Sequence, residues 1–198
     1  MNLKNYLFLL VLLLAAGARA QVPSGNAYPK REFRAAWIQA VNGQFRGVPT
    51  EKLKQTLVGQ LNSLQGAGIN AIIFQVRPEA DALYASQYEP WSRFLTGTQG
   101  QIPSPMWDPM QFMIEECHKR NMEFHAWINP YRVAAGSTNY SRLSSKNPAR
   151  KWHNNKKTRR NVLAYRGSLY YNPAKAQVRE LIVNGVKEIV QNYDVDGI

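Results

Sequence analysis

The sequence predicts an α/β protein of the (β/α)8 TIM-barrel class, in which strands and helices alternate along the chain. Short apolar runs alternate with amphipathic helical segments, a pattern typical of parallel βαβ units. The apolar runs are almost uninterrupted, as expected for strands that are covered on both faces. The loops after these runs are long and rich in Arg, Asn, Tyr and Trp. In such a barrel those loops form the active-site face.

An open, doubly wound sheet would fit the same alternation. Its dinucleotide-binding version carries a GxGxxG turn after a strand, and no such turn follows any run in this sequence. A complete barrel takes about 250 residues, whereas this chain has 198. We therefore expect the chain to cover roughly the first three βα units and the start of strand 4, as the N-terminal part of a longer protein.

Residues 1–20 have the features of a secretory signal peptide. Lys4 precedes a leucine-rich run that ends in an Ala-Arg-Ala cleavage site. The apolar core, residues 6–17, is shorter than the roughly 20 residues that a spanning helix needs, so stable membrane insertion is not expected. We predict a periplasmic or extracellular protein, with a linker over residues 21–30 and the barrel domain over residues 31–198.

Strands are expected over residues 33–39, 70–76 and 123–128, and the final VDGI reads as the start of a fourth. Thr50 is expected to cap the helix after the first strand. One face of that helix carries Leu53, Leu57, Leu61 and Leu64, and Gly66 and Gly68 end it.

Two further helices are expected after the second and third strands. Asp108-Pro109 opens the first of these, with Asp as the cap and Pro in the first turn. Its buried stripe is Met110, Met113, Ile114 and Cys117. Asn172-Pro173 is expected to open the other, with Val178, Leu181, Ile182, Val186 and Ile189 on one side. Cys117 is the only cysteine, so we read it as a core residue and expect no internal disulfide.

The charge is strongly basic and unevenly spread. The formal net charge is +12, and removing Lys4 and Arg19 with the signal peptide leaves +10. A basic segment between Ser141 and Tyr171 contains no acid. Its cations are Arg142, Lys146, Arg150, Lys151, Lys156, Lys157, Arg159, Arg160 and Arg166. For an exported protein an anionic glycan or wall polymer is a better partner than nucleic acid. The alternative is a solvated loop that aids solubility.

The segment FQVRPEADALY ends an apolar run in a burst of polar and charged side chains: Gln75, Arg77, Glu79 and Asp81. Pro78 should stop the strand ladder and start a loop at the rim of the barrel. Arg77, Glu79 and Asp81 alternate, so in an extended segment they would point the same way. A rim carboxylate beside an arginine could donate a proton or hold a sugar hydroxyl. A simple rim salt bridge between Arg77 and either acid is the alternative.

Similar chemistry follows the other predicted strands. The residues concerned are Trp37, Gln39 and Asn42 after the first strand, and Trp127, Asn129, Tyr131 and Arg132 after the third. Aromatic faces stack on sugar rings, and amide and guanidinium groups hydrogen-bond to hydroxyls. Burial in the core is the alternative for either tryptophan. With Gln75 and Arg77, these residues form the predicted glycan-binding set.

No metal or cofactor is expected. HExxH, CxxC and EF-hand patterns are absent, and His118 and His153 have no partners at metal-binding spacing. His125 lies within a predicted strand and is read as a packed core residue rather than a ligand. There is also no GxSxG motif, and scattered residues do not define a Ser/His/Asp set.

Four segments carry a family resemblance: FRAAWIQ, GINAIIFQVRPEADALY, WDPMQFMIEECHKRNMEFHAWINPYR and YDVDGI. They resemble the family-10-like glycosyl hydrolases, a group of bacterial secreted or envelope proteins. The resemblance covers the chain from about Arg31 to Ile198. It implies a (β/α)8 barrel and an enzyme that acts on glycan chains, with bacterial cell-wall glycan (peptidoglycan) or another polysaccharide as the substrate.

The resemblance also implies carboxylate acid/base catalysis. Glycosidic hydrolysis ordinarily needs two carboxyl groups, and this chain offers Glu79 and then Asp81 as candidates for one of them. The family pattern continues past DVDGI into an acidic and aromatic stretch, where the second carboxylate is expected, so this chain alone should be inactive. Two alternatives remain: a non-catalytic glycan-binding barrel, and a basic surface-attachment protein.

Overall fold

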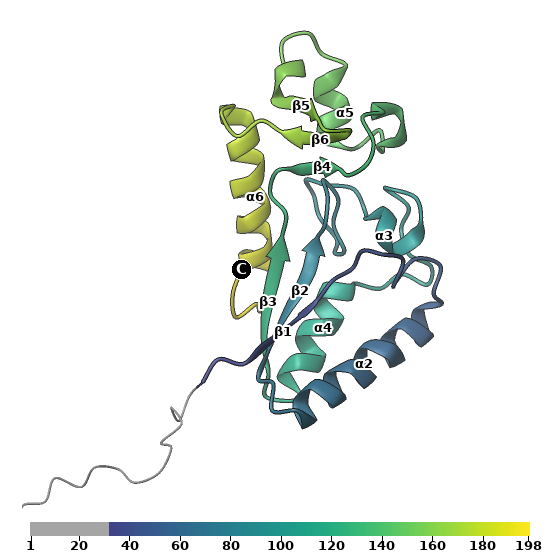
Figure 1. Cartoon of the computed structure of the whole chain (residues 1–198), viewed down its shortest axis with the longest axis vertical. Helices are drawn as coiled ribbons and strands as arrows, with labels where there is room; N and C mark the ends of the chain where they lie inside the picture. Colours follow the sequence, from purple (N-terminus) through teal and green to yellow (C-terminus); the bar gives the residue numbers. More distant parts are fainter. Residues whose placement is uncertain (1–31) are drawn as a thin grey trace, which may run out of the picture. The chain divides into compact units, whose positions relative to one another are not determined.

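A parallel sheet runs through the middle of the structure, which is a computed structural model and describes residues 32–198. Its strands are β1 (Ala35–Ile38), β2 (Ala71–Arg77) and β3 (Glu123–Ile128), in the order β1-β2-β3 (Figure 1). All three pair in parallel, as predicted. The predicted signal peptide and linker, residues 1–20 and 21–30, lie outside the described residues.

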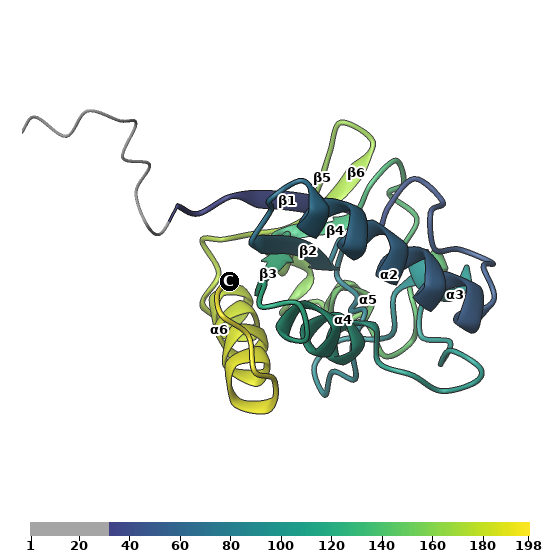
Figure 2. The same ribbon diagram turned by 90° about the horizontal axis from the view of Figure 1, so that it is seen from below.

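Two helices pack against one face of this sheet. They are α2 (Thr50–Gly66) and α4 (Pro109–His118), and α6 (Ala176–Asn192) runs alongside β3 (Figures 1 and 2). The predicted leucine and methionine stripes form the core. Its fully buried members include Leu53, Leu57, Leu61, Ile72, Phe74, Met110, Met113, Cys117 and Phe124. Cys117 is fully buried, which confirms its role as a core residue, and this burial raises the pKa of its thiol to about 12.

The start of α4 was predicted correctly, and the starts of α2 and α6 were not. Asp108 caps α4 by accepting a hydrogen bond from the Gln111 N–H at 3.0 Å. Thr50 is already inside α2, because Pro49 supplies the extended entry and no side chain caps the helix. Asn172 does not open α6. Its side chain accepts from the Ala174 N–H at 3.1 Å, which fixes a turn before the helix begins.

The end of the chain pairs with β3, as expected for the start of a further strand. Gly197 forms a parallel bridge with His125, and the Ala126 N–H donates to the Gly197 carbonyl at 2.8 Å. Asp196 accepts hydrogen bonds from the Phe124 N–H at 2.7 Å and from His118 at 2.9 Å. A Cβ on Gly197 would lie 2.3 Å from His125 Nδ1, so residue 197 has no room for a side chain.

A second, antiparallel sheet was not predicted. It contains β4 (Arg132–Ala134), β5 (Val162–Tyr165) and β6 (Ser168–Tyr171) in the order β4-β6-β5. The segments between β4 and β5 hold the short helices η1 (Tyr140–Arg142), α5 (Pro148–His153) and η2 (Arg159–Asn161). The basic segment is therefore folded, around a separate small core that includes Val133, Val162, Leu169 and Tyr171. One more short helix, α3 (Arg93–Thr96), follows β2.

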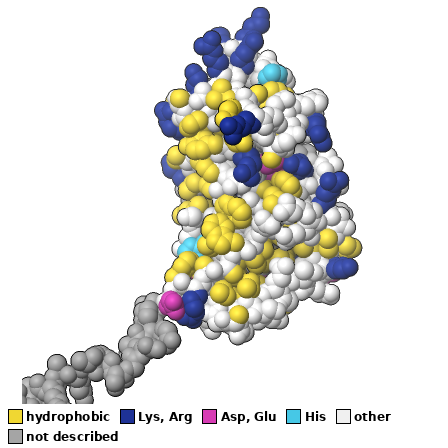
Figure 3. Space-filling model, in the orientation of Figure 1, with side chains coloured by type: hydrophobic (Ala, Val, Ile, Leu, Met, Phe, Trp, Pro, Cys, Tyr) yellow, Lys and Arg dark blue, Asp and Glu magenta, His cyan; other side chains and the backbone are white. Residues whose placement is uncertain are grey.

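Among the residues that the structure describes, the other face of the parallel sheet is left uncovered at β1. Neighbouring residues of β1 show the difference: Ile38 is 7% exposed on the helix-covered face, whereas Trp37 is 64% exposed on the opposite face. Hydrophobic side chains gather over the parallel strands in the view of Figure 3. Within residues 32–198, no helix combines the length and the apolar character needed to cross a bilayer.

Candidate functional site

Two tryptophans stand together near the carboxyl ends of β1 and β3. Trp37 and Trp127 make an edge-to-face contact with their ring centres 4.8 Å apart. The Trp127 indole N–H donates to Asn129 Oδ1 at 3.1 Å, and Asn129 Nδ2 in turn donates to the Pro78 carbonyl at 2.9 Å. Asn129 therefore holds Trp127 in place, while Trp37 presents its ring to solvent.

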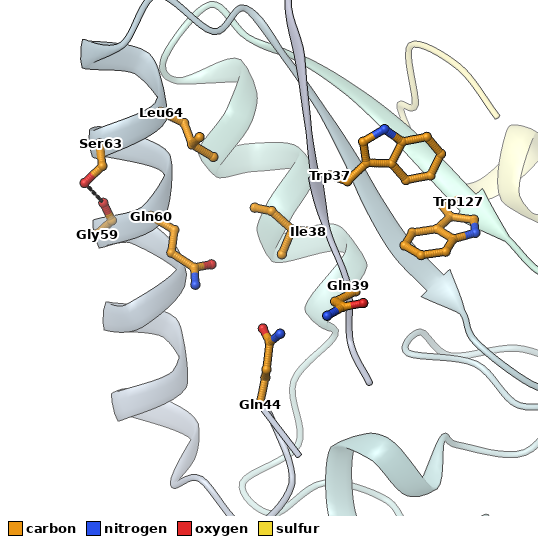
Figure 4. A pocket seen from close by; sticks show the side chains of 9 residues that line it. All are labelled: Trp37, Ile38, Gln39, Gln44, Gly59, Gln60, Ser63, Leu64 and Trp127. Carbon is orange, nitrogen blue, oxygen red and sulfur yellow. Dashed lines mark hydrogen bonds between the residues drawn. The ribbon is translucent and has the colours of Figure 1, made fainter. Parts of the chain in front are cut away.

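These tryptophans border a cavity of about 740 Å³ that we call the tryptophan cavity. Its lining residues are Trp37, Ile38, Gln39, Gln44, Gly59, Gln60, Ser63, Leu64 and Trp127 (Figure 4). The side chains of Gln44 and Gln60 extend into the space between β1 and α2. A hollow with an aromatic wall and several amides can stack a sugar ring and hydrogen-bond its hydroxyls.

Sequence reasoning found only three residues of this cavity, Trp37, Gln39 and Trp127. It missed Gln44, Gln60 and Ser63, which follow β1 or lie on α2. A glutamine or serine on the outer face of an amphipathic helix looks like any solvated residue. Only the packing of α2 beside β1 shows that these side chains line a hollow.

The remaining predicted glycan-binding residues lie elsewhere. Gln75 is buried and accepts a hydrogen bond from the Ala40 N–H at 3.0 Å, so it shapes the exit from β1. Asn42 sits exposed in the next turn with a φ of 64°. Tyr131 and Arg132 are exposed at the start of β4, where the Tyr131 carbonyl accepts from the Tyr171 N–H at 2.8 Å.

The charged side chains at the end of β2 and directly after it do not form the salt bridge between Arg77 and Glu79 or Asp81 that the sequence offered as an alternative. Arg77 forms a buried two-point ion pair with Glu89, with both contacts at 2.5 Å, and also donates to the Asn129 carbonyl. Glu79 pairs with Arg93 instead, at 2.8 and 2.9 Å. The strand ends at Arg77, as predicted, and the residues after Pro78 are not a continuous extended segment: Glu79 and Asp81 form an isolated bridge with each other, so their alternation does not set which way they point.

Glu79 borders a second cavity, of about 500 Å³, that we call the arginine cavity. Arg46, Arg93 and Arg142 line it, together with Asn139. Glu79 is only 1% exposed. Its Oε1 also accepts a hydrogen bond from the Ala135 N–H at 2.8 Å. The carboxylate is thus held rigidly at the wall of a cationic hollow.

Asp81 lies behind Glu79 and is fully buried. Burial, followed by the neighbouring charge of Glu79, raises its pKa to about 6. Hydrogen bonds from Gln99, Ser92 and the Arg93 N–H oppose this rise. Gln99 connects Asp81 to the second sheet region, since it donates to Asp81 Oδ2 at 3.1 Å and accepts from Asn147 at 3.0 Å. A carboxyl group of this kind can hold a proton near neutral pH.

The family model described as Glycosyl hydrolase-like 10 matches residues 32–198. The chain belongs to this family. One similar protein is "Glycosyl hydrolase YngK" of Bacillus subtilis (strain 168). It is 42% identical to this chain, and the match covers 98% of this chain and 38% of the relative. "Glycosyl hydrolase DigH" of Escherichia coli (strain K12) is 35% identical over 76% of this chain and 35% of the relative. The chain therefore spans little more than a third of these relatives' length.

Two solved structures resemble the fold of this chain. A maltogenic alpha-amylase, AmyB from Thermotoga neapolitana, gives a TM-score of 0.51 at 15% identity, over 83% of this chain and 38% of the other. The alpha-amylase of Geobacillus thermoleovorans gives 0.50 at 12% identity, over 83% and 39%. These are barrel glycosidases, so the likeness supports the predicted α/β class. At such identities it shows the fold alone.

Proposed function

We propose that the complete protein is an exported glycoside hydrolase on a (β/α)8 barrel, and that it cleaves a bacterial glycan such as that of the cell wall. The observation that carries this proposal is the tryptophan cavity. A solvent-exposed indole and a second indole fixed by Asn129 stand near the carboxyl ends of β1 and β3, and Gln39, Gln44 and Gln60 line the same cavity (Figure 4). That end of the strands is where barrel enzymes bind their substrates.

The proposed chemistry is carboxylate acid/base catalysis. Glu79 is the carboxylate that a sugar in the arginine cavity would meet, and Asp81 behind it holds a proton up to about pH 6. One of the two would act as acid or base, or hold a hydroxyl, opposite a second carboxylate on the other side of the bond. Arg93, which forms a two-point ion pair with Glu79, would orient that carboxylate.

The binding part of the proposal is tested with Trp37→Ala in the protein expressed from its complete coding region. Trp37 is largely exposed, so the variant should fold normally while binding of purified wall glycan falls about tenfold or more, from the loss of a stacking surface. Tyr165→Ala is the matched control, because Tyr165 is 60% exposed but lies on β5, outside the cavity. Equal binding by both variants would exclude the tryptophan cavity as the glycan site.

The catalytic part is tested with Glu79→Gln and Asp81→Asn. Release of new reducing ends from the wall glycan should fall about a hundredfold or more for the residue that acts as acid or base. Glycan binding, measured in parallel, should persist and shows that the variant is folded. Unchanged turnover in both variants would remove these two carboxylates from the mechanism.

A glycan-binding protein without hydrolysis is the second candidate, and one observation favours it. Both oxygens of Glu79 are occupied, by Arg93 and by the Ala135 N–H, and the side chain is almost fully buried. A carboxylate so engaged is suited to holding a loop in shape. Tight binding of glycan by the complete protein with no release of product would establish this second function.

A further inference from the structure

A cationic hollow lies where the basic segment meets the start of α6. It has a volume of about 620 Å³, and we call it the basic groove. The lining residues are Lys156, Lys157, Arg159, Arg160, Asn161, Lys175, Ala176 and Gln177. Lys and Arg side chains also gather at this end of the molecule in the face shown in Figure 3, over the region of β5 and α5.

The cations of the groove have no acidic partners. Within residues 32–198, none of its lysines or arginines forms an ion pair, whereas the buried Arg77 and the rim residue Arg93 each pair with a glutamate. The sequence explains this difference, since no Asp or Glu occurs between Glu123 and Glu180. Like charges held around one hollow repel each other, so an anion placed between them would lower the energy of the folded protein.

The first turn of α6 adds to this field. The helix has 17 residues, and its cap position, Lys175, makes no side-chain capping bond. The N–H groups of Ala176 and Gln177 form no hydrogen bond within the described part of the chain. Free N–H groups at the start of a long helix carry partial positive charge and suit an oxyanion.

The two walls of the groove are fixed to each other. Asn161, which is nearly fully buried, donates through Nδ2 to the Gln177 side chain at 2.7 Å. Asn172 donates to the Arg160 carbonyl at 3.2 Å and its own N–H donates to the Asn161 carbonyl at 2.8 Å. The cations of residues 156–160 therefore stay beside the start of α6 without a ligand, so the groove is preformed.

We propose that the basic groove binds the oxyanions, phosphate or carboxylate, of an acidic glycan chain. The lining favours this partner over others. No aromatic residue lines it, so nucleic-acid bases would find no stacking surface, and Ala176 is its one apolar residue, which gives a lipid tail nothing to pack against. This inference goes beyond the proposed hydrolysis, because it concerns retention on a polymer at a site outside the tryptophan and arginine cavities.

The test compares two double variants that each remove two positive charges from the same basic segment. Lys157→Gln with Arg160→Gln removes charge from the groove, and Lys146→Gln with Arg166→Gln removes it outside the groove. Binding of fluorescent polygalacturonate, phosphorylated dextran and neutral dextran is measured at low ionic strength. We expect the groove variant to bind both acidic polymers about tenfold more weakly than the native chain, and the control variant to change binding less than about threefold.

Three outcomes overturn the inference: no binding of either acidic polymer by the native chain, equal loss in the two variants, or tighter binding of single-stranded DNA than of both acidic glycans. The ratio between phosphorylated dextran and polygalacturonate identifies which oxyanion the groove prefers. All altered side chains are exposed, and the melting temperature confirms that each variant is folded. Hydrolysis of neutral glycan is assayed separately, so failure of the groove and failure of the proposed enzyme activity give different results.

Discussion

Asp81 is a carboxyl group in a place that disfavours its charge. The side chain is fully buried, and a second carboxylate, that of Glu79, lies nearby. Burial and then the charge of Glu79 raise the pKa of Asp81 from 3.8 to about 6. Between these two pH values the folded protein binds more protons than the unfolded chain does. The free energy of unfolding should therefore fall as the pH rises from about 4 to about 6.

Replacing Asp81 by Asn should remove this fall. For a shift of this size the lost pH dependence is on the order of 3 kcal/mol, while the amide oxygen can still accept from Gln99. The measurement is urea unfolding at several pH values between 4 and 7 for the native chain and the variant. Parallel stability curves for the two proteins would show that Asp81 does not titrate in this range.

The residues around Asp81 also show which contacts of the site could not be predicted from the sequence. That Arg77, Glu79 and Asp81 stand at the end of a buried strand followed from the proline and the charge pattern. Their partners did not, because Glu89 and Arg93 come from the following loop, and the chain at Ala80 is fixed by long-range hydrogen bonds to the Val133 carbonyl and from the Asn147 side chain. Charge alternation along a chain predicts sidedness only while the backbone stays extended.

At the scale of elements, Asp108 joins three parts of the fold. Its Oδ1 caps α4, and its Oδ2 accepts from the Ala85 N–H at 3.2 Å and from the Tyr193 hydroxyl at 2.7 Å. Burial and then the hydrogen bond to Asp108 raise the pKa of Tyr193. Asp108 therefore caps α4 and also joins the β2–α4 loop to the end of α6 by hydrogen bonds.

Asp108→Ala should lower the free energy of unfolding by about 2–3 kcal/mol, which exceeds the typical cost of a lost cap because other donors lose their acceptor as well. Tyr193→Phe, which removes only the hydroxyl, should cost about 1 kcal/mol. Urea denaturation of both variants and the double variant measures the coupling. If the two losses of unfolding free energy simply add in the double variant, the hydrogen bond between Asp108 and Tyr193 contributes nothing to stability.

Elements were predictable where a periodic apolar pattern decides them. The three parallel strands and the buried faces of α2 and α4 followed from Leu53, Leu57 and Leu61 and from the methionine stripe. The antiparallel sheet escaped, because β4 has only three residues and β5 is mostly exposed. Strands this short bury too few residues to give a period of two, and they form because the second core gathers around Val162, Leu169 and Tyr171.

At the scale of the molecular unit formed by Phe33–Ile198, α6 clamps a loop that lies about 100 residues earlier in the sequence. The buried Glu188 accepts hydrogen bonds from Ser86 Oγ and from the Gln87 N–H, both at 2.6 Å. Glu89, in the same loop, pairs with Arg77 on β2. Residues 86–89, which precede the Arg93 that pairs with Glu79, are therefore held by a strand and by a distant helix.

Glu188→Ala should release this loop while the core stays folded. Charge-assisted hydrogen bonds contribute about 1.5–3 kcal/mol each, so amide exchange at Gln87 should become about ten to a hundred times faster. Glu180→Ala is the matched control, since Glu180 is an exposed carboxylate on the same helix. Hydrogen exchange followed by mass spectrometry reads residues 85–89 directly, and equal exchange in both variants would refute the clamp.

The contact between Trp37 and Trp127 gives the protein an optical reporter of its own. Two indoles 4.8 Å apart and nearly perpendicular are close enough for their electronic transitions to couple, which produces a paired signal of opposite signs in circular dichroism. A molecule that covers the exposed ring of Trp37 or tilts it against Trp127 would change the size of that signal. Entry of an unlabelled ligand into the tryptophan cavity can therefore be followed by light absorption alone, without any dye or turnover.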